Sequence, residues 1–411
     1  MQTLLFPVGE AGAVWLLIQP GAGPAGIGNA MAARTDNSVM SYYNPAGLAF
    51  LTSSHISLSR MQWLPGFNLD MYHNFLSFSH QLNEMIAIGG NMIYFSYPVC
   101  NVCDDSEYWS ITLNYSMMLS SSSSVGFGLK LFTEQGPFWN ELGEDITPTK
   151  STYYAFDIGY LKKFKALDFG VSIVNMRDKI PSIYPPQADP SPINLRTGIS
   201  SVVYDDVGSL RLSFDIQKLL VATYPSMDWD GDGYIGRYDK NGAFNGSGDY
   251  NSDGQIEIWH NEENWFVGMF TSWIDDWLLG GDIDYNNDGI IGGYDANGLP
   301  TDSLEFGDPG YGQYGLMDWG NEEVTLEVGS GDNRSIQDEI DEMTFNIGIE
   351  YNYMNFVFRY GYSYCEESKI DYPAYGLGFN YKGFQIDYAQ LGGEEGHPRE
   401  GTQYFSLSYS F

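Results

Sequence analysis

The feature that most constrains the fold is an alternation of apolar and polar side chains with a period of two. Along 404–411, aromatic or apolar residues occupy every second position and serines lie between most of them. Successive side chains on a strand point to opposite faces, so such a segment has one apolar and one polar face. The pattern predicts about fourteen strands: 55–62, 71–80, 84–95, 107–118, 123–134, 152–163, 166–176, 193–204, 208–219, 343–352, 354–364, 373–382, 383–391 and 401–411.

The length of these segments indicates a membrane-spanning barrel. Most contain about ten to twelve residues, enough for a tilted strand to cross a bilayer. Strands of soluble β-sandwiches, the alternative fold, average about five or six residues. No apolar run reaches the roughly 18 residues that a membrane-spanning helix needs. We therefore expect an all-β fold, an antiparallel transmembrane barrel of about fourteen strands.

The connections between the expected strands alternate between long and short. Short ones include 163–165, 204–207, 354 and 382–383. Barrels of bacterial outer membranes have short periplasmic turns and long external loops. We therefore expect the protein to lie in the outer membrane of a Gram-negative bacterium, with outer-membrane lipid around the barrel. We expect the insertion described below to lie outside the cell. The expected long connections are 63–70, 96–106, 135–151, 177–192, 220–342, 365–372 and 392–400.

Acidic residues are concentrated in one part of the chain. The formal net charge is −34, and 27 acidic but only three basic residues lie in 220–342. This charge excludes nucleic acid as a partner. The sequence contains no hydrolase motif, so we do not expect an enzyme. We expect four parts: an N-terminal plug at 1–54, barrel strands at 55–220, an acidic insertion at 221–342 and barrel strands at 343–411.

Three segments of the insertion, 228–239, 249–260 and 284–295, follow the spacing D-x-[DN]-x-D-G. In calcium loops, positions 1, 3 and 5 supply side-chain oxygens, glycine at 6 permits the turn, 7 offers its carbonyl and 12 supplies a carboxylate. The second loop has His260, a poor calcium ligand, at position 12, and either Glu257 at position 9 or Glu262 just beyond the loop is the expected substitute. Solvated acidic turns are the alternative. The candidate Ca²⁺ ligands are Asp228, Asp230, Asp232, Tyr234, Asp239, Asp249, Asn251, Asp253, Gln255, Glu257, Asp284, Asn286, Asp288, Ile290 and Asp295.

The insertion also contains an internal repeat. The string D-x-[DN]-x-D-G-x-I-G-x-Y-D-x-N-G occurs at 228–242 and again at 284–298, which indicates a duplication. Without a metal, the excess negative charges repel one another. We therefore expect Ca²⁺ to order the insertion and its removal to loosen it.

A signature lies at 19–49, where a glycine- and alanine-rich stretch precedes an aspartate and an aromatic-Asn-Pro-Ala-Gly-Leu motif. It resembles the N-terminal signature of the PorV/PorQ family, relatives of the FadL-type barrels. This chain departs from that signature at two places: Gly23 sits where an arginine is common, and Asp36-Asn37 replaces the usual acidic pair. The matching residues are Gly21, Ala22, Gly26, Gly28, Ala30, Ala32, Asp36, Tyr43, Asn44, Pro45, Ala46, Gly47 and Leu48.

This resemblance implies a monomeric outer-membrane barrel with its N-terminal segment folded into the lumen. Members of that family serve the type IX secretion system, so the implied partners are secreted or cell-surface proteins and components of the secretion system. The large external insertion favours binding of such a protein. Two alternatives stay open: a FadL-like channel for hydrophobic small molecules, and a calcium-dependent surface structural or adhesion protein anchored by the barrel.

Overall fold

The computed structural model divides the chain into two compact units, Met1–Leu219 with Glu342–Phe411, and Leu220–Asp341. Within the part of the chain that it describes, no helix has the length and apolar character needed to span a membrane. The described residues are 11–67, 70–97, 106–139, 145–181, 188–221, 223–224, 261–262, 265–274, 304–305, 323–324, 336–366, 368, 370–393 and 399–411.

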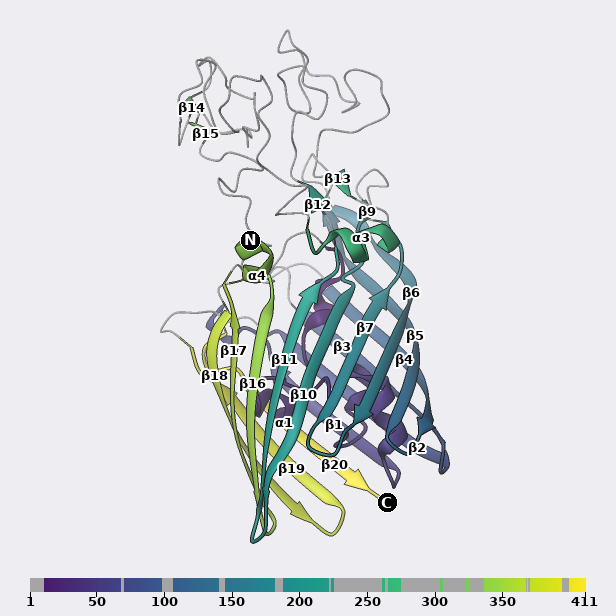
Figure 1. The fold of residues 1–411 in the computed structure, drawn as a ribbon. Helices are drawn as coiled ribbons and strands as arrows, with labels where there is room; N and C mark the ends of the chain where they lie inside the picture. The colour runs from purple at the N-terminus through teal and green to yellow at the C-terminus, as the bar shows by residue number, and fades with distance from the viewer. Residues whose placement is uncertain are drawn as a thin grey trace. The chain divides into compact units, whose positions relative to one another are not determined.

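The first unit is a closed barrel in which each of fourteen strands pairs antiparallel with the next and the last pairs with the first (Figure 1). The expected all-β barrel of about fourteen strands is thereby confirmed. The strands are β1 (His55–Gln62), β2 (Tyr72–Asn83), β3 (Ile86–Tyr97), β4 (Ser106–Ser120), β5 (Ser123–Trp139), β6 (Asp145–Lys163), β7 (Asp168–Met176), β10 (Asn194–Asp205), β11 (Ser209–Leu219), β16 (Thr344–Tyr353), β17 (Phe356–Cys365), β18 (Ile370–Tyr381), β19 (Phe384–Leu391) and β20 (Gln403–Ser410).

The alternation in the sequence separates the two faces of the barrel wall. On β17, Phe358 and Tyr360 are exposed on the outside, while Arg359 between them is buried in the lumen. On β20, the Ser408 hydroxyl lies in the lumen, 2.7 Å from that of Ser57 on β1. An apolar outer face and a closed ladder, which leaves no unpaired strand edge, are the two properties that let strands cross a bilayer.

The two rims of the barrel differ in their connections. Two-residue turns join β16 to β17 and β18 to β19, and Met354, Lys382 and Gly383 in them have positive φ angles. Such turns match the twist of antiparallel strands. The other rim carries the long connections, including the insertion between β11 and β16.

Two of the expected long connections are wrong in extent. The β5–β6 ladder continues to the pair Trp139–Asp145, so only 140–144 separate these strands instead of 135–151. The β17–β18 ladder likewise continues to Cys365–Ile370, which leaves 366–369 as the connection. In both places the backbone pairing runs past the end of the apolar alternation, because a hydrogen-bonded ladder does not require apolar side chains.

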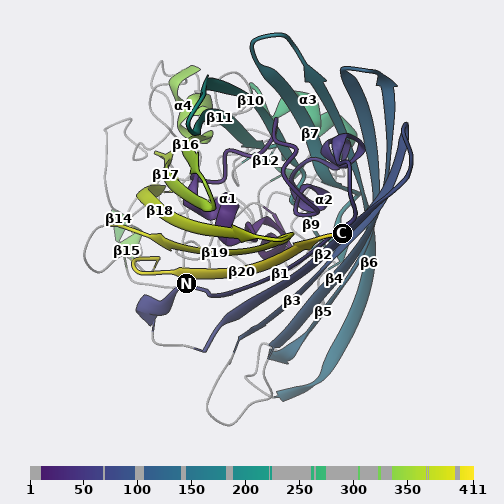
Figure 2. The same ribbon diagram turned by 90° about the horizontal axis from the view of Figure 1, so that it is seen from below.

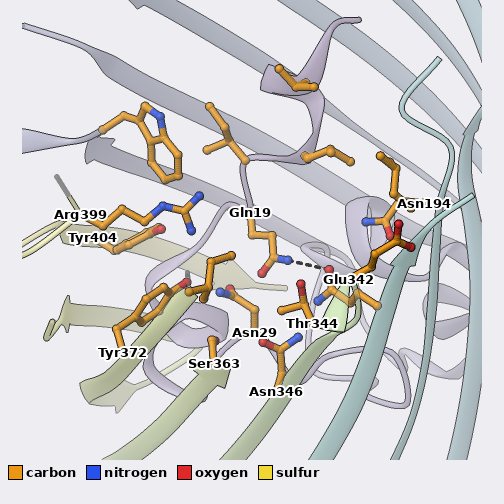
Figure 3. Close-up of a pocket in the computed structure, with 17 residues that line it drawn as sticks. Gln19, Asn29, Asn194, Glu342, Thr344, Asn346, Ser363, Tyr372, Arg399 and Tyr404 are labelled. Atoms are coloured by element: carbon orange, nitrogen blue, oxygen red, sulfur yellow. Dashed lines mark hydrogen bonds between the residues drawn. The ribbon is translucent and has the colours of Figure 1, made fainter. Parts of the chain in front are cut away.

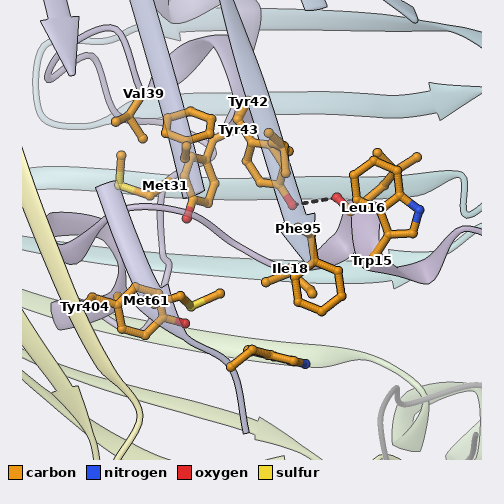
Figure 4. Packing of buried hydrophobic residues seen from close by; sticks show 14 of the residues in the cluster. Trp15, Leu16, Ile18, Met31, Val39, Tyr42, Tyr43, Met61, Phe95 and Tyr404 are labelled. Carbon is orange, nitrogen blue, oxygen red and sulfur yellow. Dashed lines mark hydrogen bonds between the residues drawn. The ribbon is translucent and has the colours of Figure 1, made fainter. Parts of the chain in front are cut away.

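The N-terminal segment lies inside the ring of strands, as the view from below shows for α1 and α2 (Figure 2). We call its described residues, 11–54, the hatch. The hatch contains η2 (Val14–Leu17), α1 (Ala22–Gly26), α2 (Met40–Tyr43) and η3 (Pro45–Phe50). Its Trp15, Tyr42 and Tyr43 pack with wall residues such as Phe75 and Phe95 in one buried cluster (Figure 4).

The remaining described elements are short. A pair of two-residue strands, β8 (Ile180–Pro181) and β9 (Ala188–Asp189), and one turn of helix, η4 (Pro65–Phe67), belong to the barrel unit. The second unit contains β12 (Thr223–Tyr224) paired with β13 (Asn261–Glu262), β14 (Leu304–Glu305) paired with β15 (Glu323–Val324), α3 (Trp265–Thr271) and α4 (Ile336–Asp341).

Candidate functional site

The Asn-Pro motif of the hatch is tied to both the hatch and the barrel wall. The Asn44 side chain accepts a hydrogen bond from the Ala46 amide at 3.1 Å, which caps η3, and Pro45 occupies the first turn of that helix. Proline suits this position because its missing N–H would have no partner there. The Asn44 amide nitrogen donates to the Ala32 carbonyl at 2.8 Å and to the Tyr160 carbonyl of β6 at 3.2 Å.

Glycines in the wall allow the hatch backbone to approach the strands directly. A Cβ atom on Gly170 of β7 would overlap the Ala32 carbonyl oxygen. A Cβ atom on Gly361 of β17 would overlap the Gly28 amide nitrogen. Gly28 itself has a φ of 60°, a conformation that glycine adopts at little cost. At these glycines, the backbone of the hatch therefore packs directly against the backbone of the strands.

Ion pairs connect the hatch to β16, β16 to β17, and β17 to β19. The Arg34 guanidinium donates to Glu350 at 2.7 Å and pairs with Asp36 at 2.8 Å. Arg359 donates to the other Glu350 oxygen at 2.7 Å and to Asp387 at 2.6 Å. Except for Asp36, these side chains are at most 9% exposed.

The charge of Arg34 is favoured by this arrangement. Burial disfavours the charged form, but the carboxylates of Asp36 and Glu350 outweigh burial and raise the pKa of Arg34 above its ordinary value. Such a network holds the hatch firmly because removing one member leaves a partner charge buried.

Hydrogen bonds from three further strands hold the hatch. Asp215 of β11 accepts from the Ala32 amide at 2.6 Å, and Ser172 of β7 donates to the Tyr43 carbonyl at 2.7 Å. Arg196 of β10 donates to the Tyr42 carbonyl at 3.1 Å, and its guanidinium lies 4.7 Å from the centre of the Tyr42 ring. The hatch is thus anchored around much of the ring.

Two cavities lie on the two sides of the hatch and share no lining residue. One, of about 110 Å³, is lined by hatch residues such as Gln19 and by strand ends at the rim of the long connections, such as Leu219 and Glu342 (Figure 3). Gln19 donates to the Gln217 side chain at 2.8 Å across it. The other, of about 240 Å³, lies toward the tight turns and contains Arg34, Glu350 and Arg359.

The sequence-predicted residues divide into two groups. The motif residues lie in the hatch, and all of them are buried except Asp36: Gly21, Gly26, Gly28, Asp36, Asn44, Pro45, Ala46, Gly47 and Leu48. The candidate calcium ligands at 228–239, 249–257 and 284–295 lie outside the residues that the structure describes.

Sequence analysis did not identify the wall residues Glu350, Arg359 and Asp387, which are far from the hatch in the sequence and close to it in the folded protein. Each of them is a charged residue on the polar face of an alternating strand. That signal could have indicated that these side chains face the lumen, but it could not have indicated which residues they contact.

Comparison with known proteins decides the family. The sequence model described as "Type IX secretion system membrane protein PorP/SprF" matches residues 37–286, which include the Asn-Pro motif and β1 to β11. The chain belongs to the PorP/SprF family. Membership makes it a type IX secretion system membrane protein. The expected type IX secretion relationship is confirmed at this level, whereas the PorV/PorQ assignment is not confirmed. No curated protein matches the sequence of this PorP/SprF chain.

Several solved structures resemble the PorP/SprF chain at low identity. The Ralstonia pickettii toluene transporter TbuX is 11% identical, covers 95% of this chain and 98% of its own, and gives a TM-score of 0.49. The CymD monoaromatic hydrocarbon channel is 12% identical, covers 96% and 98%, and gives 0.48. A Pseudomonas aeruginosa FadL homologue is 11% identical, covers 94% and 97%, and gives 0.43.

Proposed function

We propose that this PorP/SprF-family chain is an outer-membrane component of a type IX secretion system that binds a secreted or cell-surface protein at the rim of its long connections. The observation that carries the proposal is the filled lumen. A barrel of this size encloses more space than its own side chains fill, and here the hatch occupies it.

The contacts of the hatch support a permanent plug. Its backbone touches strand glycines directly, and buried ion pairs join Arg34 to Glu350 and, through it, to Arg359. Displacing the hatch would break the buried pair of Arg34 with Glu350, which is costly. Binding at a rim requires no such displacement, whereas passage of a solute requires a path past the hatch.

The connectivity of the barrel indicates which rim takes part. The longest connection leaves from the end of β11 and returns at the start of β16, and these strands are neighbours, with Gln217 opposite Thr344. Residues 220–342 thus occupy a connection that a short turn could have made. We infer that this insertion supplies the partner-binding surface, outside the cell, in the manner of PorV/PorQ-like proteins.

We further propose that Ca²⁺ orders this insertion through the loops at 228–239 and 284–295, with 249–260 as a third, weaker site. The support is the spacing of oxygen ligands and the concentration of negative charge, which a divalent cation offsets. External calcium modules work at about 10⁻⁴–10⁻³ M Ca²⁺. Partner binding should therefore need calcium in the medium.

The test is affinity purification of the tagged full chain from outer membranes, with Ca²⁺ or with EGTA. A variant in which Asn-Gly replaces 220–341 should keep the barrel, because β11 and β16 are adjacent strands whose ladder ends at the pair Gln217–Thr344, close enough for a short turn to join them. A discrete secreted or surface protein should copurify with the parent chain in Ca²⁺ only, and not with the variant. Equal recovery with parent and variant would overturn the proposal.

The competing function is that of a channel for hydrophobic molecules, and a second assay tests it. Proteoliposomes containing the parent chain are tested for uptake of a labelled monoaromatic hydrocarbon, with protein-free liposomes as the control. We expect no uptake above the control. Uptake by the parent chain, together with failure to recover a partner, would replace the binding function by transport.

A further inference from the structure

The outward face of the barrel contains a groove over the seam, where the first and last strands pair. The groove measures about 620 Å³ and is formed by β19, β20, β1, β2 and β3, which follow one another around the ring (Figure 2). Such an outward-facing apolar surface is in contact with the acyl chains of the membrane. Its apolar lining consists of Leu58, Leu76, Met92, Ile386, Phe405 and Leu407.

Strand pairing shows that most of these side chains form one continuous row. Leu58 of β1 lies opposite Leu407 of β20 on one side and Leu76 of β2 on the other. The row continues from Leu76 to Met92 of β3 and from Leu407 to Ile386 of β19. Each of these five side chains is at least 36% exposed, so all of them point out of the wall.

Toward the rim of the long connections, the groove ends at a positive charge. Arg60 is the next outward-facing residue of β1, and it lines the groove together with Asn74, its partner on β2. The Arg60 guanidinium lies 4.3 Å from the centre of the Tyr72 ring, and no carboxylate among the described residues pairs with it. The carboxylate in the lining, Asp387, is buried and bonds to Arg359 in the lumen. The groove therefore offers one uncompensated cation.

Arg60 lies at the level where outward-facing side chains change from apolar to polar. The next outward-facing residues toward the same rim are Gln62 on β1 and Gln403 on β20, and Gln403 lies opposite Gln390 of β19. Barrels of outer membranes have an apolar band only as tall as the acyl-chain region. Its end at Arg60 indicates the depth of the lipid headgroups, where a cation costs little and can contact an anionic headgroup.

We propose that this groove is a binding site for lipid A, the phosphorylated and multiply acylated glycolipid of the outer leaflet. One phosphate contacts Arg60, and acyl chains lie along the apolar row. A guanidinium suits a phosphate because it donates paired hydrogen bonds to two phosphate oxygens. The choice of leaflet rests on the proposed function, in which the long connections lie outside the cell. Since Leu58 and Leu407 belong to β1 and β20, the bound lipid contacts both strands of the seam.

The test uses the full chain, delipidated in detergent, and native mass spectrometry at increasing lipid concentration. The probes are lipid A, the same lipid A after enzymatic removal of its phosphates, and phosphatidylglycerol. The dephosphorylated form keeps the acyl chains and lacks the anion. We expect one lipid A per barrel to bind at least tenfold more tightly than the dephosphorylated form, and more tightly than phosphatidylglycerol.

Variants locate the phosphate. Arg60→Gln removes the charge and should weaken lipid A binding by about tenfold or more, the effect of one hydrogen bond to a charged group. Arg60→Lys keeps the charge and should retain most of the affinity. Lys382→Gln is the matched control, because Lys382 lies in the turn between β18 and β19 and does not line the groove. Folding of each variant is checked by the heat-dependent shift of barrel mobility in SDS gels.

Each outcome decides. Equal binding of lipid A and its dephosphorylated form, or unchanged affinity of folded Arg60→Gln, would mean that the groove holds only unselected membrane lipid and would overturn the proposal. Phosphatidylglycerol that binds as tightly as lipid A would overturn the assignment to the outer leaflet. None of the five strands flanks residues 220–342, so the variant that lacks 220–341 should bind lipid A as the parent does. The lipid site and the proposed partner binding can therefore fail separately.

Discussion

Arg34 of the hatch donates a 2.7 Å hydrogen bond to Glu350 of β16, although 316 positions of sequence separate the two residues. Glu350 also accepts from Arg359, so its carboxylate lies between two guanidinium groups inside the barrel. The contact makes seating of the hatch and formation of the C-terminal strands mutually dependent.

Loss of the Arg34 side-chain charge should destabilise the barrel. We expect Arg34→Met to lower the free energy of unfolding by about 3 kcal/mol, because a buried pair loses one member. The measure is urea unfolding in detergent, followed by tryptophan fluorescence. Arg211→Met is the control, since the pair of Arg211 with Asp36 is partly exposed and should contribute less than about 1 kcal/mol. Equal effects of the two variants would contradict the assigned role of Arg34.

Side chains placed at the close-approach glycines should unseat the hatch. Gly170→Ala and Gly361→Ala each introduce a Cβ that overlaps hatch backbone, and we expect a loss of about 1–3 kcal/mol of stability. Planar-bilayer recordings should show open events that the parent chain lacks. In Gly393→Ala the new Cβ has no neighbour closer than 3.8 Å among the residues that the structure describes, so this control should behave as the parent does. Closed, fully stable Gly170→Ala and Gly361→Ala barrels would refute backbone contact at these positions.

Calcium should protect the insertion from proteolysis. We expect trypsin and proteinase K to cleave within 220–342 in EGTA and much more slowly at about 1 mM Ca²⁺, with a midpoint near 10⁻⁴–10⁻³ M. The double variant Asp228→Asn with Asp284→Asn removes the first ligand of two loops and should lose the protection. Asp302→Asn changes the charge of the insertion outside the loops and should retain it. Equal cleavage of the parent chain with and without Ca²⁺ would rule out ordering by the metal.

A charged side chain introduced on the outward face of a strand should lower the stability of the barrel in lipid. Leu113 is 58% exposed on β4, at mid-strand, and we expect Leu113→Lys to cost about 2–4 kcal/mol in lipid. Met354 is 80% exposed but lies in a turn, so Met354→Lys should cost about 1 kcal/mol or less. The two are compared by folding into liposomes, monitored on SDS gels. Similar folding yields would show that Leu113 does not face lipid.

Much of the barrel was predictable because its strands follow a local rule. Alternation placed Phe405 and Leu407 outside and Ser406 inside, as the structure has them. It also located every strand, and most of the predicted strand ends lie within a few residues of the observed ends. Alternation could not predict how far β5 and β6 extend, since their ladder continues through residues that lack the pattern.

The lumen was less predictable because its contacts are not local. The hatch motif identified Asn44 and Pro45 through a resemblance, but nothing in the sequence paired Arg34 with Glu350 or Ala32 with Asp215. Such contacts depend on which strands stand opposite each other across a closed ring. The calcium loops are predicted by ligand spacing alone, and their ligands stay a prediction.

The seam of the ring, where β1 pairs with β20, has a consequence for biogenesis. The first and last strands zip along seven residue pairs from His55–Ser410 to Met61–Tyr404, and Ser54 and Phe411 exchange backbone hydrogen bonds just beyond. Neither edge has its proper neighbour until the far end of the polypeptide arrives. We therefore expect a chain truncated before β20 to leave β1 with an unpaired edge, which a barrel in a bilayer cannot tolerate.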